Sequence, residues 1–89
     1  MKQIIITAQF EKSIKRAKKR GYDLSRLRRL VLMLAQGDLD ARQFHDHPLK
    51  GKYEGLRECH ITPDWLLIYF STNIEVTLIN SGTHADLFK

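Results

Sequence analysis

The stretch LRECHITPDWLLIYFSTNIEVTLI, residues 56–79, decides the fold of this 89-residue chain. It holds three strand signals, of which the last two are rich in β-branched and aromatic side chains. These three runs occupy residues 56–61, 65–70 and 74–79. The two connections between them are too short for a crossover, so we expect antiparallel neighbours. The middle run is apolar on both faces, which predicts a central strand.

The residues at the start of the chain predict a strand followed by a helix. Residues 3–7 form a short run with three isoleucines, which favours a strand. Thr7 can cap a helix that stops at Gly21. One face of this helix carries Phe10, Ile14 and Ala17, and the remainder carries Lys12, Lys15, Arg16, Lys18 and Lys19.

A second helix has the clearest periodic pattern in the chain. Asp23 or Ser25 caps it, and Gly37 ends it. Its buried stripe is expected to comprise Leu24, Leu27, Leu30, Val31 and Leu34, with Arg26, Arg28 and Arg29 on the outer face.

Residues 38–55 have no clear period and are interrupted by Pro48, Gly51 and Gly55, so we expect a long loop around the body. The predicted fold class is α+β. It has an N-terminal strand, a two-helix hairpin, a three-stranded antiparallel sheet and a short C-terminal turn. No linker, repeat or low-complexity segment divides the chain, which predicts a single domain over residues 1–89.

The composition limits the class of protein. A hydrophobic content of 43% is enough for one small core. The single cysteine, Cys59, excludes an internal disulfide and fits a reducing compartment. No apolar run approaches the roughly 20 residues of a membrane span, and the first residues are too quickly polar for a signal peptide. We therefore expect a cytoplasmic protein that makes no membrane contact.

The charge is unevenly distributed. The chain has a net charge of +5, but residues 1–30 hold ten Lys/Arg against two Asp/Glu, whereas residues 31–89 hold five against eight. A dense basic surface favours a polyphosphate partner through counterion release, or an acidic protein. The expected contacts on the two helices are Lys15, Lys18, Lys19, Arg26 and Arg29. A solvated helix face kept soluble by its charge is the alternative.

Histidines gather in the second half of the chain. His47, His60 and His84 are accompanied there by two carboxylates, Glu58 and Asp64. Imidazole changes charge near neutral pH, so such a set can supply both a proton acceptor and a proton donor. Strand alternation puts Glu58 and His60 on the same face, where the carboxylate can fix the tautomer of the imidazole.

The same residues permit other interpretations. A zinc site could use His47, His60, Asp64 and His84 together with His45, which would make the chain a metal-dependent hydrolase. Ligand spacings typical of zinc are nevertheless absent. The basic helices alone could serve a non-enzymatic nucleic-acid or protein-binding module. Singly, each histidine fits a cap or a surface position, Asp64 is a common turn residue, and His45 is expected to be an exposed loop residue.

Three motifs together resemble one family. HPLKGKYEGLRECH (47–60), PDWLLIY (63–69) and GTHADLF (82–88) are similar to the YafQ-type toxins of the RelE/ParE superfamily. The resemblance implies a RelE-like fold and a type II toxin–antitoxin toxin that cleaves mRNA on the ribosome and inhibits translation. It also implies binding to a cognate antitoxin, to mRNA and to rRNA, as a monomer when free and a hetero-oligomer with antitoxin. Neither a metal nor a cofactor is implied, and a gyrase-targeting relative is the alternative within the superfamily.

The resemblance also implies a set of site residues. Carried over by position, the catalytic residues are His47, Glu58, His60, Asp64, His84 and Phe88. We hypothesise that His84 is the general acid and that His60 or His47 is the base or a phosphate contact. The two carboxylates would orient the histidines, and Phe88 would stack on a base. Trp65 belongs to the matched Pro-Asp-Trp element and is expected to contact RNA, although it also suits the core.

One position departs from the family pattern. Many members carry arginine where this chain has Asn80, so a fixed positive charge is missing near the phosphate. Asn80 can donate a hydrogen bond, but a weaker one than a charged group would. Lys50, Lys52 and Arg57 are the candidates to supply the charge and to contact RNA.

Overall fold

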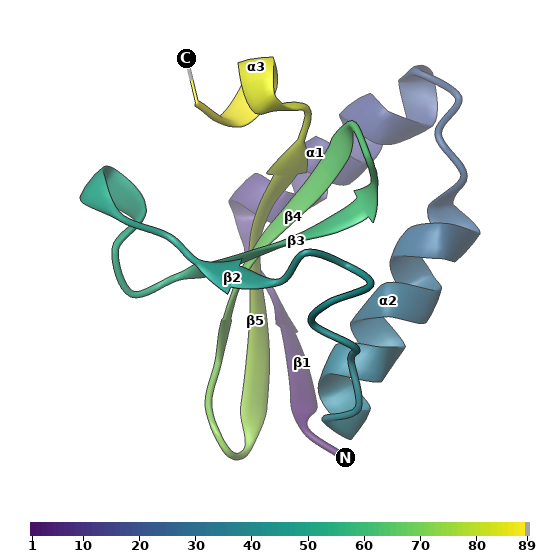
Figure 1. Ribbon diagram of the computed structural model, residues 1–89. Helices are drawn as coiled ribbons and strands as arrows, with labels where there is room; N and C mark the ends of the chain where they lie inside the picture. The colour runs from purple at the N-terminus through teal and green to yellow at the C-terminus, as the bar shows by residue number, and fades with distance from the viewer. Residues whose placement is uncertain (89) are drawn as a thin grey trace.

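The computed structural model describes residues 1–88 and consists of one five-stranded sheet, two long helices and a short C-terminal helix (Figure 1). The elements are β1 (Gln3–Ile6), α1 (Ala8–Lys19), α2 (Leu24–Gln36), β2 (His47–Pro48), the 3₁₀ helix η1 (Gly51–Tyr53), β3 (Arg57–Thr62), β4 (Trp65–Ser71), β5 (Glu75–Gly82) and α3 (His84–Leu87). The strand order is β1-β5-β4-β3-β2. The predicted α+β class is confirmed.

The ends of the long helices follow from local chemistry. The Thr7 hydroxyl accepts a hydrogen bond from the Phe10 N–H at the start of α1. At the start of α2, the Asp23 carboxylate accepts one from the Ser25 N–H, so Asp23 rather than Ser25 is the cap. Gly37 closes α2 with a left-handed φ of 77°, which glycine adopts without steric cost.

The sheet is larger than expected. The antiparallel pairing of β3, β4 and β5 is confirmed. However, β1 joins the same sheet, parallel to β5, and β2 pairs with β3 at the opposite edge. The expected loop over residues 38–55 is therefore wrong in part, because it contains β2 and η1. A two-residue strand is too short for a period-2 pattern, so its pairing with β3 has no local signal.

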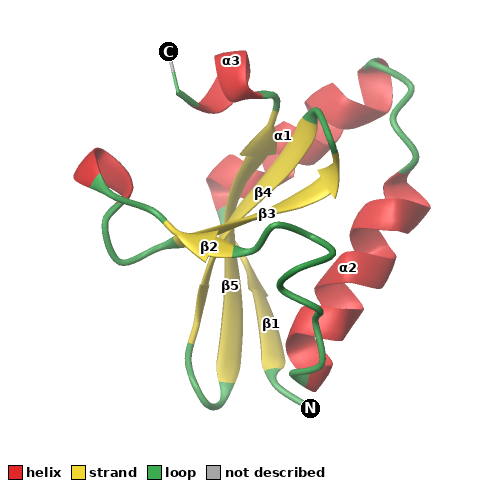
Figure 2. Ribbon diagram, viewed as in Figure 1, coloured by secondary structure: helices red, strands yellow, loops and turns green. Residues whose placement is uncertain are grey.

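Two layers of side chains cover β4. On one face, Leu67 and Tyr69 pack in the main core with the inner faces of α1 and α2. On the other face, Leu66, Ile68 and Leu87 form a smaller cluster, flanked by the η1 region. The expected burial of both faces of the central strand is thus confirmed. Figure 2 shows α3 at the end of β5 that lies away from the N-terminus. Within residues 1–88, no helix has the length and apolarity to cross a membrane.

Candidate active site

Strands β2 and β3 bring two histidines to one buried carboxylate. His47 lies directly opposite Glu58 in the strand register, and His60 follows Glu58 on the same face of β3. The Glu58 Oε1 atom is 3.4 Å from His60 Nε2 and 3.8 Å from His47 Nε2, and the Glu58 side chain is only 3% exposed. A buried carboxylate needs polar partners, and the two imidazoles are ion-pair partners for Glu58 when they are protonated. The predicted proximity of Glu58 and His60 is confirmed.

Helix α3 brings a third histidine to the same face of the sheet. His84 is the first residue of α3, and its ring centroid is 6.4 Å from that of His60. Leu87, three residues later, packs on Leu66 and Ile68, which anchors α3 over that face. The Phe88 ring is 5.5 Å from the His84 ring. His47, His60, His84 and Phe88, which we call the histidine strip, therefore follow one another along the surface.

A second aromatic supports the end of the strip. Tyr53 of η1 meets Phe88 edge to face at 5.5 Å, and its hydroxyl donates to the Leu87 carbonyl at 3.0 Å. Phe88 remains 36% exposed, so part of its ring is open to a ligand. Lys52 lies over the Tyr53 ring, with its Nζ 5.1 Å from the ring centroid. The exposed Lys52 and Lys50 thus flank the Phe88 end of the strip.

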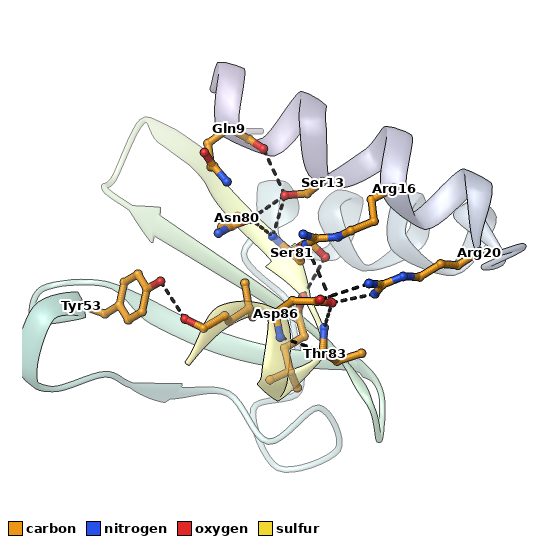
Figure 3. Close-up of polar contacts among 11 residues, drawn as sticks. Gln9, Ser13, Arg16, Arg20, Tyr53, Asn80, Ser81, Thr83 and Asp86 are labelled. Carbon is orange, nitrogen blue, oxygen red and sulfur yellow. Dashed lines mark hydrogen bonds and ion pairs between the residues drawn. The ribbon is translucent and has the colours of Figure 1, made fainter. Parts of the chain in front are cut away.

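Helix α1 holds α3 in place with two arginines. Arg20 donates two hydrogen bonds to the Asp86 carboxylate, at 2.6 and 3.1 Å, and Arg16 donates to the Ser81 carbonyl at 2.7 Å (Figure 3). Asp86 also accepts from the Thr83 N–H at 2.8 Å and so completes a capping box at the start of α3. We call Arg16, Arg20 and Asp86 the α3 clamp.

The clamp has two electrostatic consequences. The Arg20 hydrogen bonds, followed by the Thr83 N–H, hold the pKa of Asp86 below its usual range, and Asp86 in turn raises the pKa of Arg20. Asp86 is therefore ionised at neutral pH. The expectation that Arg16 belongs to the free outer face of α1 is wrong, because its guanidinium turns toward β5 and α3.

Open clefts connect the strip with α2. One cleft is lined by His45, His60 and Pro63 together with Arg26 of α2. Arg26 also lines a neighbouring cleft with Asp64 and Trp65. Asp64 lies in the β3–β4 turn, and none of the ion pairs or hydrogen bonds found within residues 1–88 joins it to a histidine. Arg26 thus lines both the cleft that holds Asp64 and the cleft that holds His60.

Two predicted RNA contacts are directed away from the strip. Trp65 is 3% exposed and packs against Tyr22 at 5.0 Å, so the expectation that its ring contacts RNA is corrected to a core position. Arg57 lies opposite Tyr69 on the helix-covered face, and its Nε is 3.3 Å from Asp46 Oδ1. Arg57 therefore does not supply a positive charge to the histidine face.

Asn80 is likewise engaged in the fold. Its amide oxygen accepts hydrogen bonds from the Ser13 hydroxyl of α1 and from the Ser81 N–H (Figure 3). Its amide nitrogen is the remaining donor. The other predicted basic contacts are exposed on the helices: Lys15, Lys18 and Lys19 on α1, and Arg26 and Arg29 on α2.

The zinc interpretation has no preformed ligand set in the described part of the chain. Among residues 1–88, no three His, Cys, Asp or Glu side chains are arranged to hold a metal ion. His47 and His60 share one carboxylate, and the rings of His60 and His84 approach each other, which is an arrangement that can exchange protons.

Sequence reasoning missed two features of the site. His45 is exposed, as expected, but its ring is 5.2 Å from that of His60. The α3 clamp was not anticipated, because its partners are more than 60 residues apart in the chain. The only local signal was the Thr83-to-Asp86 spacing, which is that of a capping box.

Comparison with known proteins identifies close relatives. A family model described as bacterial toxin of type II toxin-antitoxin system, YafQ, matches residues 2–89. The mRNA interferase toxin YafQ of Escherichia coli (strain K12) is 38% identical over 88 residues, which are 98% of this chain and 96% of the relative. The crystal structure of YafQ from E. coli strain BL21(DE3) is similar with a TM-score of 0.92 and 36% identity, over 100% of both chains. YafQ in the E. coli DinJ-YafQ toxin-antitoxin complex gives a TM-score of 0.89 and 37% identity, over 99% of this chain and 98% of that chain.

Proposed function

The chain belongs to the YafQ family of bacterial toxins of type II toxin–antitoxin systems, and on that premise we propose that the histidine strip is its RNA-cleaving site. Like the relatives named mRNA interferases, it is an endoribonuclease. The observation that carries the proposal is the placement of His60 and His84 on one open face, with ring centroids 6.4 Å apart and Phe88 beside them.

The reaction is a transesterification within the RNA strand. The 2′-oxygen forms a bond to the adjacent phosphorus, the bond from phosphorus to the 5′-oxygen breaks, and a 2′,3′-cyclic phosphate remains. A base takes the proton of the 2′-hydroxyl, and an acid gives a proton to the departing 5′-oxygen. We assign the acid role to His84, and the base role to His60 or His47. Two imidazoles on opposite sides of the phosphate satisfy both requirements without a metal.

The buried carboxylate organises the two histidines of the strands. Because the Nε2 atoms of both His47 and His60 face Glu58, the carboxylate orients both rings. Glu58 acts through these histidines. Its own burial keeps it from contacting the substrate.

The surroundings of the strip suit an RNA strand. Phe88 offers a partly open ring for stacking on a base, and Lys50 and Lys52 are available to phosphates nearby. At the other end, Arg26 supplies a positive charge to the cleft beside His60, and it also lines the cleft that holds Asp64. We propose that Arg26 supplies the positive charge that Asn80 lacks.

The wider partners follow from the family. A YafQ toxin has been solved in complex with the antitoxin DinJ. We propose that this chain binds its own cognate antitoxin, acts on mRNA in the ribosomal A site in the cytoplasm, and uses Lys15, Lys18, Lys19 and Arg29 for contacts to rRNA.

Induced expression tests the assignment of the histidines. We expect the wild-type chain to arrest growth and to produce new 5′ ends inside translated messages. His60→Ala and His84→Ala should lose both effects at equal protein level, because each variant lacks one proton-transfer group. Lys12→Ala, an exposed change on α1, is the matched control and should behave as wild type.

The alternatives make different predictions in the same cultures. Growth arrest without new 5′ ends would point to a target other than mRNA. Cuts that persist at full rate in both histidine variants would show that the strip is not the catalytic site.

A further inference from the structure

His45 has a backbone conformation that its residue type disfavours. Its φ is 52°, and it is the one non-glycine residue with a positive φ among residues 1–88. The left-handed region brings Cβ close to the following carbonyl oxygen, so residues other than glycine adopt it uncommonly, with asparagine, aspartate and histidine the most frequent among them. Such strain persists only where the neighbouring structure enforces it, and it gathers at functional sites.

Contacts on both sides of His45 enforce that conformation. Before it, the Phe44 carbonyl accepts a hydrogen bond from the His60 N–H at 2.7 Å. After it, the Asp46 carboxylate accepts from the Tyr69 hydroxyl at 2.8 Å and from Arg57 Nε at 3.3 Å. The chain is thus pinned to β3 and β4 on either side of His45.

The turned backbone directs the His45 carbonyl at His47. The carbonyl oxygen lies 2.7 Å from His47 Nδ1. A carbonyl only accepts hydrogen bonds, so Nδ1 of His47 must carry a proton. The neutral ring then accepts a proton at Nε2, the nitrogen 3.8 Å from Glu58 Oε1, and only the protonated ring can donate toward that carboxylate. The His45 backbone therefore selects the tautomer of His47.

The His45 ring acts on the second histidine of the strip. It packs against His60 with a centroid distance of 5.2 Å and a tilt of 50°, and both residues line the cleft that contains Arg26. His45 thus contacts His47 through its main chain and His60 through its side chain.

We propose that His45 is a positioning residue of the histidine strip, whose strained main chain fixes the tautomer and orientation of His47 while its ring braces His60. This inference rests on the proposed nuclease function for its biological meaning. Its structural content, the tautomer of His47, can be measured without any RNA.

Three substitutions test the contributions of the His45 main chain and of its ring separately. Glycine adopts a positive φ freely and removes the ring, asparagine tolerates a positive φ and keeps a polar side chain, and valine disfavours a positive φ strongly. His45→Gly and His45→Asn should preserve the carbonyl contact to His47, whereas His45→Val should break it.

The first measurement is imidazole ¹⁵N NMR of the free protein labelled at histidine, at a pH where the rings are neutral. We expect His47 to be the Nδ1–H tautomer in the wild type, His45→Gly and His45→Asn, and to lose that tautomer in His45→Val. A thermal melt of each variant confirms folding. A wild-type His47 in the Nε2–H form, or an unchanged tautomer in folded His45→Val, would overturn the proposal.

The second measurement is single-turnover RNA cleavage by the same variants, with binding measured separately. The loss of one hydrogen bond should lower the cleavage rate of His45→Val by about tenfold with little change in RNA affinity. His45→Asn keeps the main-chain contact to His47 and loses only the ring that packs on His60, so its rate should lie between those of wild type and His45→Val. If tautomers change as expected but rates do not, the positioning role is wrong while the nuclease assignment stands. If the His47 tautomer changes in the variants as expected but the wild-type protein does not cleave RNA, the result would count against the nuclease assignment alone.

Discussion

Gly82, the last residue of β5, packs tightly against the α3 clamp. A Cβ atom there would lie 2.6 Å from an Arg16 guanidinium nitrogen and 2.8 Å from Asp86 Cβ. Real Cβ atoms do not approach other atoms so closely, so a side chain at this position must push the α3 clamp apart. The glycine of the Gly-Thr-His motif is therefore explained by packing against the clamp, next to the candidate acid His84.

The corresponding variant is Gly82→Ala. We expect it to lower the free energy of unfolding by about 1–3 kcal/mol, the range for inserting a methyl group into a filled site. RNA cleavage should fall as well, because α3 carries His84. Ala85→Ser, a small change at an exposed position of the same helix, is the control for denaturant unfolding and cleavage. If Gly82→Ala and wild type had equal free energies of unfolding, α3 would be able to shift and accommodate the added methyl group without cost.

Single residues differ in how far the sequence predicts them. The neighbouring positions of Glu58 and His60 follow from strand alternation, which is a local property. The role of His45 does not follow from the sequence. Its positive φ depends on hydrogen bonds that Phe44 and Asp46 accept from residues of distant strands. Trp65 is ambiguous in sequence because the same ring suits a core or a base, and only its burial against Tyr22 decides.

A helix or strand could be predicted where the spacing of apolar residues within it is enough to define it. The apolar stripes of α1 and α2 and the three runs that became β3, β4 and β5 carry enough residues for a clear period. Strand β2 and the parallel placement of β1 carry no such signal, since both depend on which strand edge is free. The site depends on this missed element, because β2 places His47 opposite Glu58.

The attachment of α3 to α1 predicts an effect on cleavage at the level of elements. With four residues, α3 is too short to be stable alone, so its position depends on the clamp. Arg20→Ala removes both hydrogen bonds to Asp86 and should lower the rate constant of cleavage more than it weakens RNA binding, because His84 loses its fixed distance to His60. Arg20→Lys keeps the charge without the two-pronged geometry and should recover part of the rate.

Rapid-quench cleavage and RNA affinity, measured for Arg20→Ala, Arg20→Lys and the control Lys12→Ala, separate these effects. The clamp would be irrelevant to catalysis if Arg20→Ala cleaved at the wild-type rate, or if all three variants differed only in affinity.

At the scale of the whole molecule, the basic residues of α1 fall into two groups. Arg16 and Arg20 are engaged in the α3 clamp, whereas Lys15, Lys18 and Lys19 remain exposed on α1. The exposed basic side chains of residues 1–30, which also include Arg26 and Arg29 of α2, are the ones available to phosphates. Neutralising a phosphate with such a side chain releases counterions, so the salt dependence of binding reports how many phosphates are neutralised.

The double variant Lys18→Ala/Lys19→Ala should therefore weaken ribosome binding and reduce the slope of log K against log salt by about 1–2, roughly one unit for each phosphate that is no longer neutralised. The double variant Lys12→Ala/Arg28→Ala removes the same charge from exposed positions outside the predicted set and is the matched control. Equal slopes for the two doubles would mean that net charge alone attracts the ribosome. A smaller slope for Lys18→Ala/Lys19→Ala alone, with single-turnover cleavage of bound message unchanged, assigns α1 to docking and leaves the chemistry to the histidine strip.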